Sequence, residues 1–296
     1  MKKWIIGMML FSTIYSCGLC NWISRTAAIF ADEETPEADV VDLPEPTQSK
    51  DNLPAIQEKQ ETALPVNEAD DLIGVYLVDE APDSFYVIST GNYVVFDGPT
   101  SPQNLRDVYI TTQNGNASIY TWNLKNKTLY LEFTLGMGTS LSIDGTVASF
   151  TGMDDKGGKV VFHKVEDTGS AWSIRYAAYG AALTSLMNGL KSRFQTLKEN
   201  PNSFSSEYDP GNWYPNVYNL VESMERTANR VNALPDPPAG SGIKEKVKNQ
   251  AAPFLKLSRA IADVLFDGNP QSLISAYNQN VPAAGEMLKT FPALPK

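Results

Sequence analysis

The chain has 296 residues, of which 42% are hydrophobic and 20% are charged, so it is long enough for about two domains and is not disordered throughout. It contains one histidine, His163, and two cysteines, Cys17 and Cys20, so we expect no zinc site, no Cys-His catalytic pair and no other cofactor. The net charge of −10 argues against a nucleic-acid binder, because neutralising phosphates requires a basic face.

Residues 1–31 have the pattern of an export signal, because lysines precede an uncharged run over residues 4–20. Three outcomes stay open. Cleavage could follow Ala31; Cys17 could carry a lipid, since the residues before it resemble a lipobox; or the apolar run could remain as a membrane anchor of about 20 residues. Each outcome predicts a protein that is secreted or anchored on the outer face of the cytoplasmic membrane, with the membrane contacted only through this segment.

Residues 32–71 differ sharply in composition from the rest of the chain. They contain thirteen acidic residues, two lysines, five prolines and no aromatic residue, which gives a local charge of −11. Such a stretch buries too little apolar surface to offset the entropy of ordering, so we expect a disordered acidic linker that acts as a spacer. The remaining residues sum to about +1, so the acidity of the chain belongs to the spacer. What disfavours nucleic-acid binding is therefore the lack of a concentrated basic face, together with the expected export from the cell.

Residues 72–166 contain short runs rich in aromatic and β-branched residues, with glycine-containing turn signals between them. Consecutive short strands predict an antiparallel meander, and a meander of this size usually closes into a barrel because closure removes its edges. The predicted strands cover residues 72–79, 84–90, 93–97, 107–112, 117–123, 128–134, 139–144, 146–152 and 159–165.

The order of motifs in this region resembles that of bacterial lipocalin-like domains. An opening Gly74-Val75-Tyr76 is similar to the Gly-x-Trp of that family, with tyrosine in place of tryptophan. It is followed by Gly91-Asn92-Tyr93, by Ser118–Trp122, by Leu129–Leu131, by Leu141–Gly145 and by a final Val161–Lys164. The resemblance covers about 95 residues and implies a lipocalin-like barrel more firmly than it implies a ligand.

A barrel of about eight strands is either filled by side chains or holds one small molecule. The inward candidates are large, so we expect a filled interior, and they are also the candidate ligand-binding residues if a small apolar ligand enters. We expect His163 to be a strand residue without a catalytic or metal-binding role, because it has no partner histidine. The inward candidates are Tyr76, Val78, Tyr93, Val95, Leu129, Leu131, Phe133, Val160 and Phe162, with Tyr76, Tyr93, Leu131, Phe133 and Phe162 the candidate ligand contacts.

Residues 169–296 show apolar residues at three- and four-residue steps, which predicts amphipathic helices. We expect an antiparallel four-helix bundle, so the fold class is an α+β multidomain protein. Ser241 is the expected N-cap of the third helix, Pro253 is expected to kink or break it, and Pro282 is expected to bend the fourth. The predicted helices cover residues 171–199, 213–233, 241–267 and 270–290.

Aromatic residues near helix starts are candidate partner contacts, namely Trp172, Trp213 and Tyr214. The bundle also contains five scattered arginines, for which helix-surface salt bridging is the simpler interpretation, since Glu222 lies four residues before Arg226. A di-metal bundle site is excluded because the region has no histidine. The five arginines are Arg175, Arg193, Arg226, Arg230 and Arg259.

No nucleophile elbow, phosphate-binding loop or dinucleotide fingerprint occurs in the sequence. The order of parts favours a non-enzymatic binding or interaction module, held off the cell surface by the acidic spacer, with an unidentified protein or envelope component as its partner. Two alternatives stay open. One is a lipocalin-like carrier of a small apolar ligand, and the other is a hydrolase of surface polymers, which would need two carboxylates about 5–10 Å apart in a deep groove.

Overall fold

The computed structural model describes residues 64–82, 85, 87–100, 104–112, 114–132, 138–201 and 213–295. The predicted export signal, Cys17 and the predicted acidic linker up to residue 63 lie outside the described residues. Within the described ranges, no helix is both long and apolar enough to cross a membrane. The strands and helices below belong to one compact unit that runs from Gln60 to Lys296.

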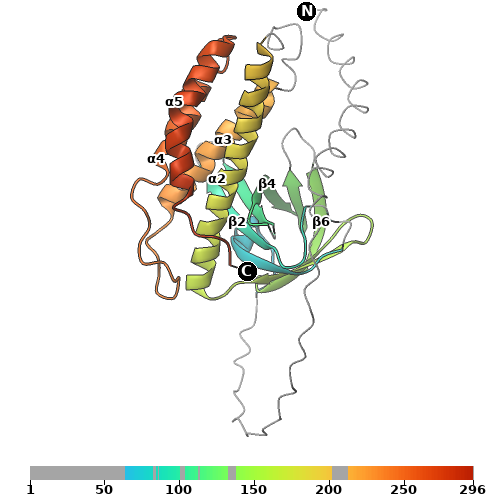
Figure 1. The fold of residues 1–296 in the computed structure, drawn as a ribbon. Coiled ribbons are helices and arrows are strands. Elements are labelled where there is room, and N and C mark those ends of the chain that lie inside the picture. The colour runs from blue at the N-terminus through green and yellow to red at the C-terminus, as the bar shows by residue number, and fades with distance from the viewer. Residues whose placement is uncertain are drawn as a thin grey trace, which may run out of the picture. The chain divides into compact units, whose positions relative to one another are not determined.

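Eight antiparallel strands form a closed barrel in which each strand pairs with the next and β8 pairs with β1. Figure 1 shows the barrel with the helices gathered on one side of it. The closed barrel and the helices that follow it confirm the predicted α+β architecture. The strands are β1 (Gly74–Glu80), β2 (Tyr93–Thr100), β3 (Leu105–Thr111), β4 (Ala117–Lys125), β5 (Thr128–Glu132), β6 (Gly138–Gly145), β7 (Ser149–Met153) and β8 (Lys159–Lys164).

The prediction of a ninth strand over residues 84–90 is wrong, because none of its described residues is in a strand. This stretch belongs to the β1–β2 connection, which closes with a turn in which Gly91 has φ 81° and Asn92 N donates to Ser89 O. Ile88 is buried in the barrel core although it is not in a strand. The apolar residues that suggested a strand therefore cover the barrel instead of extending its sheet.

Strands β2 and β3 are buried on both faces. Val94, Phe96, Val108 and Ile110 point into the barrel, whereas the residues that alternate with them point outward to the helices. A sheet covered on both faces carries almost continuous apolar runs, as these two strands do. Tyr93, Val95 and Tyr109 belong to the outward set.

The barrel interior is filled by aromatic rings, in agreement with the expected filled state. The rings of Phe150 and Phe162 are stacked with centroids 4.6 Å apart, and Tyr76 meets Phe150 edge to face at 5.3 Å. Phe96 lies 5.7 Å from Tyr76 and 5.1 Å from Trp122. Offset and edge-to-face pairs of this kind are favourable beyond the area that they bury.

A short 3-10 helix, η1 (Ala69–Leu72), packs against the barrel core through the buried Leu72. Arg106 of β3 ties this helix to the barrel wall, because its Nη1 lies 2.6 Å from Asp70 Oδ1 and its guanidinium lies 5.4 Å from the Trp122 ring. Part of the segment predicted as spacer, up to residue 71, is therefore ordered against the barrel.

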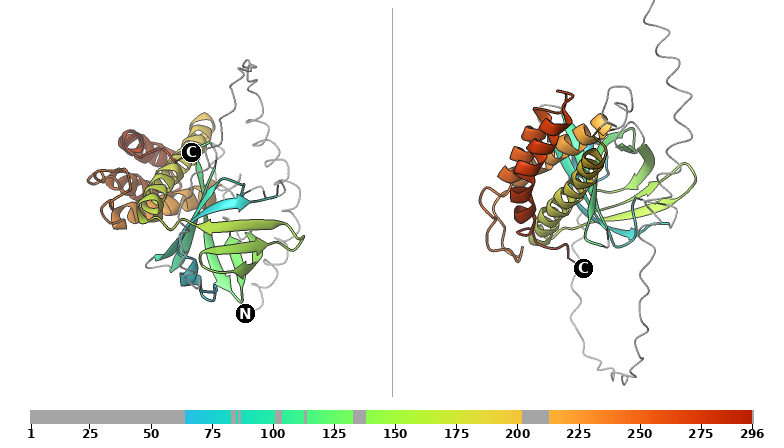
Figure 2. Two further views of the ribbon diagram at one scale, coloured as in Figure 1. Left: turned by 90° about the horizontal axis from the view of Figure 1, so that it is seen from below. Right: turned by 45° about the horizontal axis from the view of Figure 1, so that its top comes forward.

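Four helices follow the barrel, and each contacts its neighbour in the chain, while α2 also contacts α5. Asp167 begins α2 as an N-cap that accepts a hydrogen bond from Ser170 N at 2.6 Å, and Asn269 caps α5 in the same way. Figure 2 shows the helices as a layer beside the barrel. The helices are α2 (Thr168–Glu199), α3 (Trp213–Ala233), α4 (Ala252–Ala262) and α5 (Pro270–Leu288).

The predicted start of the third helix at Ser241 is wrong, because α4 begins at Ala252 and Pro253 lies in its first turn. Gly240, Gly242 and Asn249 have φ values of 83°, 72° and 57°, which interrupt a helix. Proline suits the first turn of a helix because its missing N–H has no partner there. Pro253 therefore starts the helix rather than kinking it.

Helix α2 lies against strands β1 to β4 and joins the two parts of the fold. Outward residues of β2 and β3 share one apolar cluster with the helices, and this cluster includes Val95, Tyr109, Leu183 and Leu190. The barrel and the helices are thus packed through a common core.

Candidate functional site

Three of the five candidate ligand contacts lie in the barrel core, namely Tyr76, Leu131 and Phe162. The inward placement of Tyr93 is wrong, because Tyr93 packs against the helical cluster on the outer face, and the same holds for Val95. Residues 93–96 of β2 are all apolar, so the sequence does not tell which alternate pair points into the barrel. In the structure, Val94 and Phe96 are the pair that points inward. Phe133 lies outside the described residues.

Tyr76 carries a polar atom into this apolar interior. Its hydroxyl has no hydrogen-bond partner among the described residues, and the side chain is fully buried. Burial, together with the nearby Asp71 carboxylate, raises the pKa of Tyr76 above its usual value. The rings of Phe96 and Phe150 lie 5.7 and 5.3 Å from that of Tyr76, so the side chain that carries this hydroxyl is part of the aromatic packing of the barrel.

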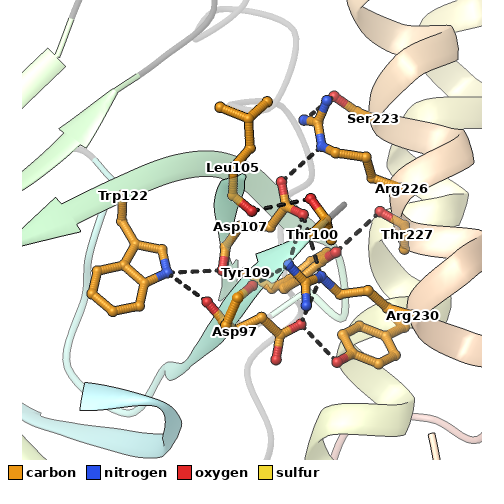
Figure 3. A network of polar contacts seen from close by, with 12 residues as sticks. Asp97, Thr100, Leu105, Asp107, Tyr109, Trp122, Ser223, Arg226, Thr227 and Arg230 are labelled. Carbon is orange, nitrogen blue, oxygen red and sulfur yellow. Dashed lines mark hydrogen bonds and ion pairs between the residues drawn. The ribbon is translucent and has the colours of Figure 1, made fainter. Parts of the chain in front are cut away.

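The outer face of the barrel carries a buried ion network, in which Asp107 of β3 meets two arginines of α3 (Figure 3). Arg226 Nε lies 3.0 Å from Asp107 Oδ1, and Arg230 places Nε and Nη2 each 3.2 Å from Oδ2. The Asp107 side chain is 1% exposed and the two arginine side chains are 11% and 12% exposed.

Asp97 of β2 extends the same network. Arg230 Nε lies 3.2 Å from Asp97 Oδ2, and the Tyr179 hydroxyl of α2 donates a hydrogen bond of 2.7 Å to that oxygen. Arg175 Nε lies 3.5 Å from Asp97 Oδ1 as an ion pair, and this nitrogen has no hydrogen-bond partner among the described residues. Two helices therefore converge on one strand pair.

Main-chain groups complete this network and connect it to the barrel interior. Arg230 Nη2 donates to Gly98 O at 2.6 Å, and Trp122 Nε1 lies 3.1 Å from the carbonyl oxygens of both Asp97 and Asp107. The hydroxyls of Tyr109 and Thr227 are 3.2 Å apart. Figure 3 shows Tyr109 and Arg230 between the strands and α3, with Trp122 approaching from the opposite side of the strands.

The electrostatics of the network follow from its burial. Burial raises the pKa of Asp97, while Arg230, Arg175 and the hydrogen bond from Tyr179 oppose that rise. Burial also raises the pKa values of Tyr109 and Tyr179 well above their usual range, and the carboxylates add to this. Burial disfavours the charge of Arg230, but the neighbouring Asp97 and other acidic groups outweigh burial and raise its pKa. The acidic and basic side chains of the network therefore compensate one another at a largely buried interface.

The expected surface arginines therefore play different roles. The predicted Glu222–Arg226 pair is present at 3.5 Å, but Arg226 also holds Asp107. Arg259 makes an exposed pair with Glu225 at 3.5 Å. Exposed pairs of this kind contribute about 0–1 kcal/mol, whereas breaking a buried pair costs several times more.

The candidate partner contacts do not form one surface. Trp172 is buried and donates from Nε1 to Pro235 O at 3.1 Å, so it is part of the core. Trp213 donates from Nε1 to Arg193 O at 3.3 Å, and Tyr214 stacks with Phe266 at 6.3 Å. Phe266 is 72% exposed, which makes it the most exposed aromatic side chain among the described residues.

A hollow of about 630 Å³ lies where the rim of the barrel meets α2. The barrel contributes Tyr93 and the β3–β4 turn, α2 contributes small residues, and the segment after α5 forms the remaining wall. None of the described lining residues carries an acidic, basic or thiol group. They are Gly91, Tyr93, Thr111, Thr112, Asn114, Gly115, Ala177, Gly180, Ala181, Thr184, Leu288 and Phe291–Pro295.

A larger hollow of about 920 Å³ lies beside the 244–250 segment and has lining charges of both signs. Its central lysine is already engaged, because Lys246 Nζ donates to the carbonyl oxygens of Val231 and Asn232 at 3.1 and 3.3 Å. The last carbonyl groups of a helix have no partner within the helix, and here the Lys246 side chain reaches the C-terminal end of α3 and donates to them. This hollow therefore surrounds a helix cap.

Comparison with known proteins gives no family assignment. No protein-family model matches the chain. A search of curated proteins gives no match either. Within the described ranges, no group of three or more His, Cys, Asp or Glu residues is arranged to hold a metal ion.

Neither the ion network nor the hollow was predicted from the sequence. Asp97 directly follows the apolar run of β2, and Asp107 directly precedes that of β3, and both are spaced with the outward set. When a carboxylate alternates with apolar residues on the outer face of a strand, the pattern indicates that helices cover this face and that the carboxylate forms a buried ion pair there. The hollow carried no local signal, because its lining comes from four separate parts of the chain.

Proposed function

We propose that this chain is a non-enzymatic interaction module that binds a neutral, extended segment of a partner protein in the hollow beside Tyr93. In this proposal the lipocalin-like barrel is a rigid support rather than a container. The export signal and acidic spacer expected from the sequence would present the module outside the cytoplasmic membrane.

The packing of the barrel disfavours the carrier alternative. Five large aromatic side chains occupy the interior, with ring centroids as close as 4.6 Å. A carrier of this size needs an internal cavity, and interiors packed at this density leave few voids larger than a water molecule.

The fate of the buried carboxylates disfavours the hydrolase alternative. Asp97 and Asp107 are brought together by Arg230, but their side chains are only 5% and 1% exposed and lie under α2 and α3. A pair of catalytic carboxylates must reach both a substrate and a water molecule. These two instead neutralise arginines at an internal interface.

The observation that carries the proposal is the neutral hollow at the junction of barrel and helices. Tyr93 contributes an aromatic ring, and Thr111, Thr112 and Thr184 contribute hydroxyls. Each of these hydroxyls also makes a hydrogen bond within the chain, with Tyr93 N, with Asn116 O and with Gly180 O respectively. Such a mixture suits a peptide, whose backbone offers hydrogen-bonding groups without charge. The ion network supports this use of the junction, because it ties the two walls of the hollow into one body.

The proposal is tested with the full-length chain and a pool of N-acetylated, C-amidated neutral peptides, observed by saturation-transfer NMR. We expect Tyr93→Ala to weaken binding by about tenfold, since aromatic anchors often contribute more than 1 kcal/mol. Tyr130→Ala is the matched control, because Tyr130 is an exposed strand tyrosine that does not line the hollow. Equal binding by wild type and Tyr93→Ala, or no binding of any neutral peptide by the wild type, contradicts the proposal.

A further inference from the structure

The segment after α5, Phe291–Pro295, forms one wall of the hollow, and it is held at its first residue. The ring of Phe291 lies 5.3 Å from that of Tyr176 and 6.3 Å from that of Phe254. Gly180 of α2 admits this ring, since a Cβ atom there would lie 2.5 Å from the Phe291 side chain. The start of the segment therefore fits a place that α2 leaves open for it.

Hydrogen bonds secure the same end of the segment. Thr290 Oγ1 accepts from Gln250 Nε2 at 2.7 Å, and Gln250 Oε1 accepts from the Tyr176 hydroxyl at 2.6 Å. Beyond Phe291, no backbone hydrogen bond joins residues 292–295 to the other described residues. Hydrogen bonds therefore hold the chain up to Thr290, and from Phe291 onward it is held by side-chain packing against the helices.

The side chains that pack are spaced by three residues. Phe291 and Leu294 contact the helical cluster, whereas Ala293 and Pro295 are exposed. A polyproline II helix has three residues per turn and no internal hydrogen bonds, so residues i and i+3 share a face. Pro292 and Pro295 fix their own φ angles and limit the unfolded alternatives. The i, i+3 spacing of the two packed side chains is the spacing that an extended, proline-containing ligand presents to the surface that binds it.

We propose that Phe291–Pro295 occupies a groove that adjoins the hollow beside Tyr93 and can be displaced from it, and that this groove takes an extended partner segment with the pattern Phe-Pro-x-Leu-Pro. The proposal rests on the binding role of the hollow and adds the class of ligand and a mode of regulation. The resident segment competes from within the same chain at a high effective concentration, so a free peptide binds the intact chain weakly.

The test uses a fluorescein-labelled peptide, TFPALPK, which reproduces residues 290–296, and measures its binding by fluorescence polarisation. One protein is truncated after Thr290, and a second is the full-length Leu294→Asp, which retains the Phe291 anchor. We expect the truncated chain to bind the peptide at least about tenfold more tightly than the wild type does, because the internal competitor is removed. Leu294→Asp should gain affinity by a smaller factor, because Phe291 stays in place and only the second contact of the competitor is weakened. The peptide should also raise the melting temperature of the truncated chain, since it binds only the folded state.

Two controls make the result specific. Leu64→Asp changes a leucine in the same Ala-Leu-Pro context, but Leu64 is 73% exposed and does not line the hollow, so it should bind the peptide as the wild type does. A peptide with aspartate in place of its leucine should bind none of the proteins. If the truncated chain fails to fold, Leu294→Asp alone decides the outcome.

Equal affinity of the peptide for wild type, truncated chain and Leu294→Asp overturns the inference, as does a gain of affinity in Leu64→Asp. These outcomes leave the proposed function intact if neutral peptides still bind the full-length chain through Tyr93. Loss of Tyr93-dependent binding overturns the proposed function itself, so the two failures are distinguishable.

Discussion

Arg230 of α3 and Asp107 of β3 lie 123 positions apart in the chain, and the guanidinium holds the carboxylate through both Nε and Nη2 at 3.2 Å. This pair joins the barrel to the helices at a buried position. A buried ion pair contributes little net free energy to folding, but removing one partner is strongly destabilising because the other charge then stays buried without compensation.

Asp107→Asn should therefore lower the free energy of unfolding by about 3–5 kcal/mol, because Arg226 and Arg230 would face a neutral amide in a buried site. Chemical denaturation monitored by circular dichroism measures this change. Asp155→Asn, at an exposed turn position, is the control and should change stability by less than about 0.5 kcal/mol. Equal effects of the two substitutions would show that the network does not fasten barrel to helices.

Gly180→Ala should destabilise the protein by about 1–3 kcal/mol, because the added methyl group overlaps the Phe291 ring. Gly285→Ala, in α5, meets no atom within 4 Å and should be neutral or stabilising by up to about 1 kcal/mol. Thermal unfolding of the two variants gives the comparison. A Gly180→Ala variant as stable as Gly285→Ala would contradict the placement of Phe291 on α2.

The N-cap of α2 predicts a dependence of stability on pH. Hydrogen bonds from Ser170 lower the pKa of Asp167 below its ordinary value of 3.8. The folded state thus binds this proton less tightly than the unfolded chain. The stabilisation is complete above pH 3.8 and is lost as the pH falls through the pKa of the folded state.

Asp167→Ala should accordingly melt below wild type at neutral pH, and the difference should shrink as the pH falls below 3.8. Asp167→Asn keeps a capping side chain that does not titrate, so the difference in stability between Asp167→Asn and Asp167→Ala should not change with pH. Melting curves over a pH series test the prediction. A difference between Asp167→Ala and wild type that is the same at all pH values would exclude the cap as its source.

Phe150→Ala should cost about 3–5 kcal/mol, since Phe150 is buried and stacks on Phe162. The cavity that it leaves is apolar and should bind a small ligand such as benzene or xenon. Wild type should take up neither, which can be measured by xenon-induced NMR shifts. Stoichiometric uptake of either ligand inside the wild-type barrel would instead revive the carrier alternative.

Local patterns predicted much of the fold. The bounds of α3 and the opening of α5 at Pro270 follow from apolar periodicity and proline placement, and both are observed. Closure of the barrel followed from consecutive short strands, whose edges must be paired. These features depend on neighbours in the chain, where spacing and turn residues are informative.

The site was less predictable because its parts meet only in the fold. Asp107 pairs with Arg226 and Arg230 across 119 and 123 positions, and no local spacing indicates which helix face meets which strand. The phase of β2 was ambiguous because both of its faces are apolar. Gly180 gave no sign that it makes room for a phenylalanine 111 positions later.

The most direct measurement is amide chemical-shift mapping of the TFPALPK peptide on the isotope-labelled Leu294→Asp chain. The account predicts shifts at Tyr93, Thr111 and Thr184, on the two walls of the hollow, and unchanged resonances for Leu131 and Phe162 in the barrel wall. Shifts centred on the barrel residues, or no shifts at any peptide concentration, would contradict the claim that this protein binds its partner in the outer hollow.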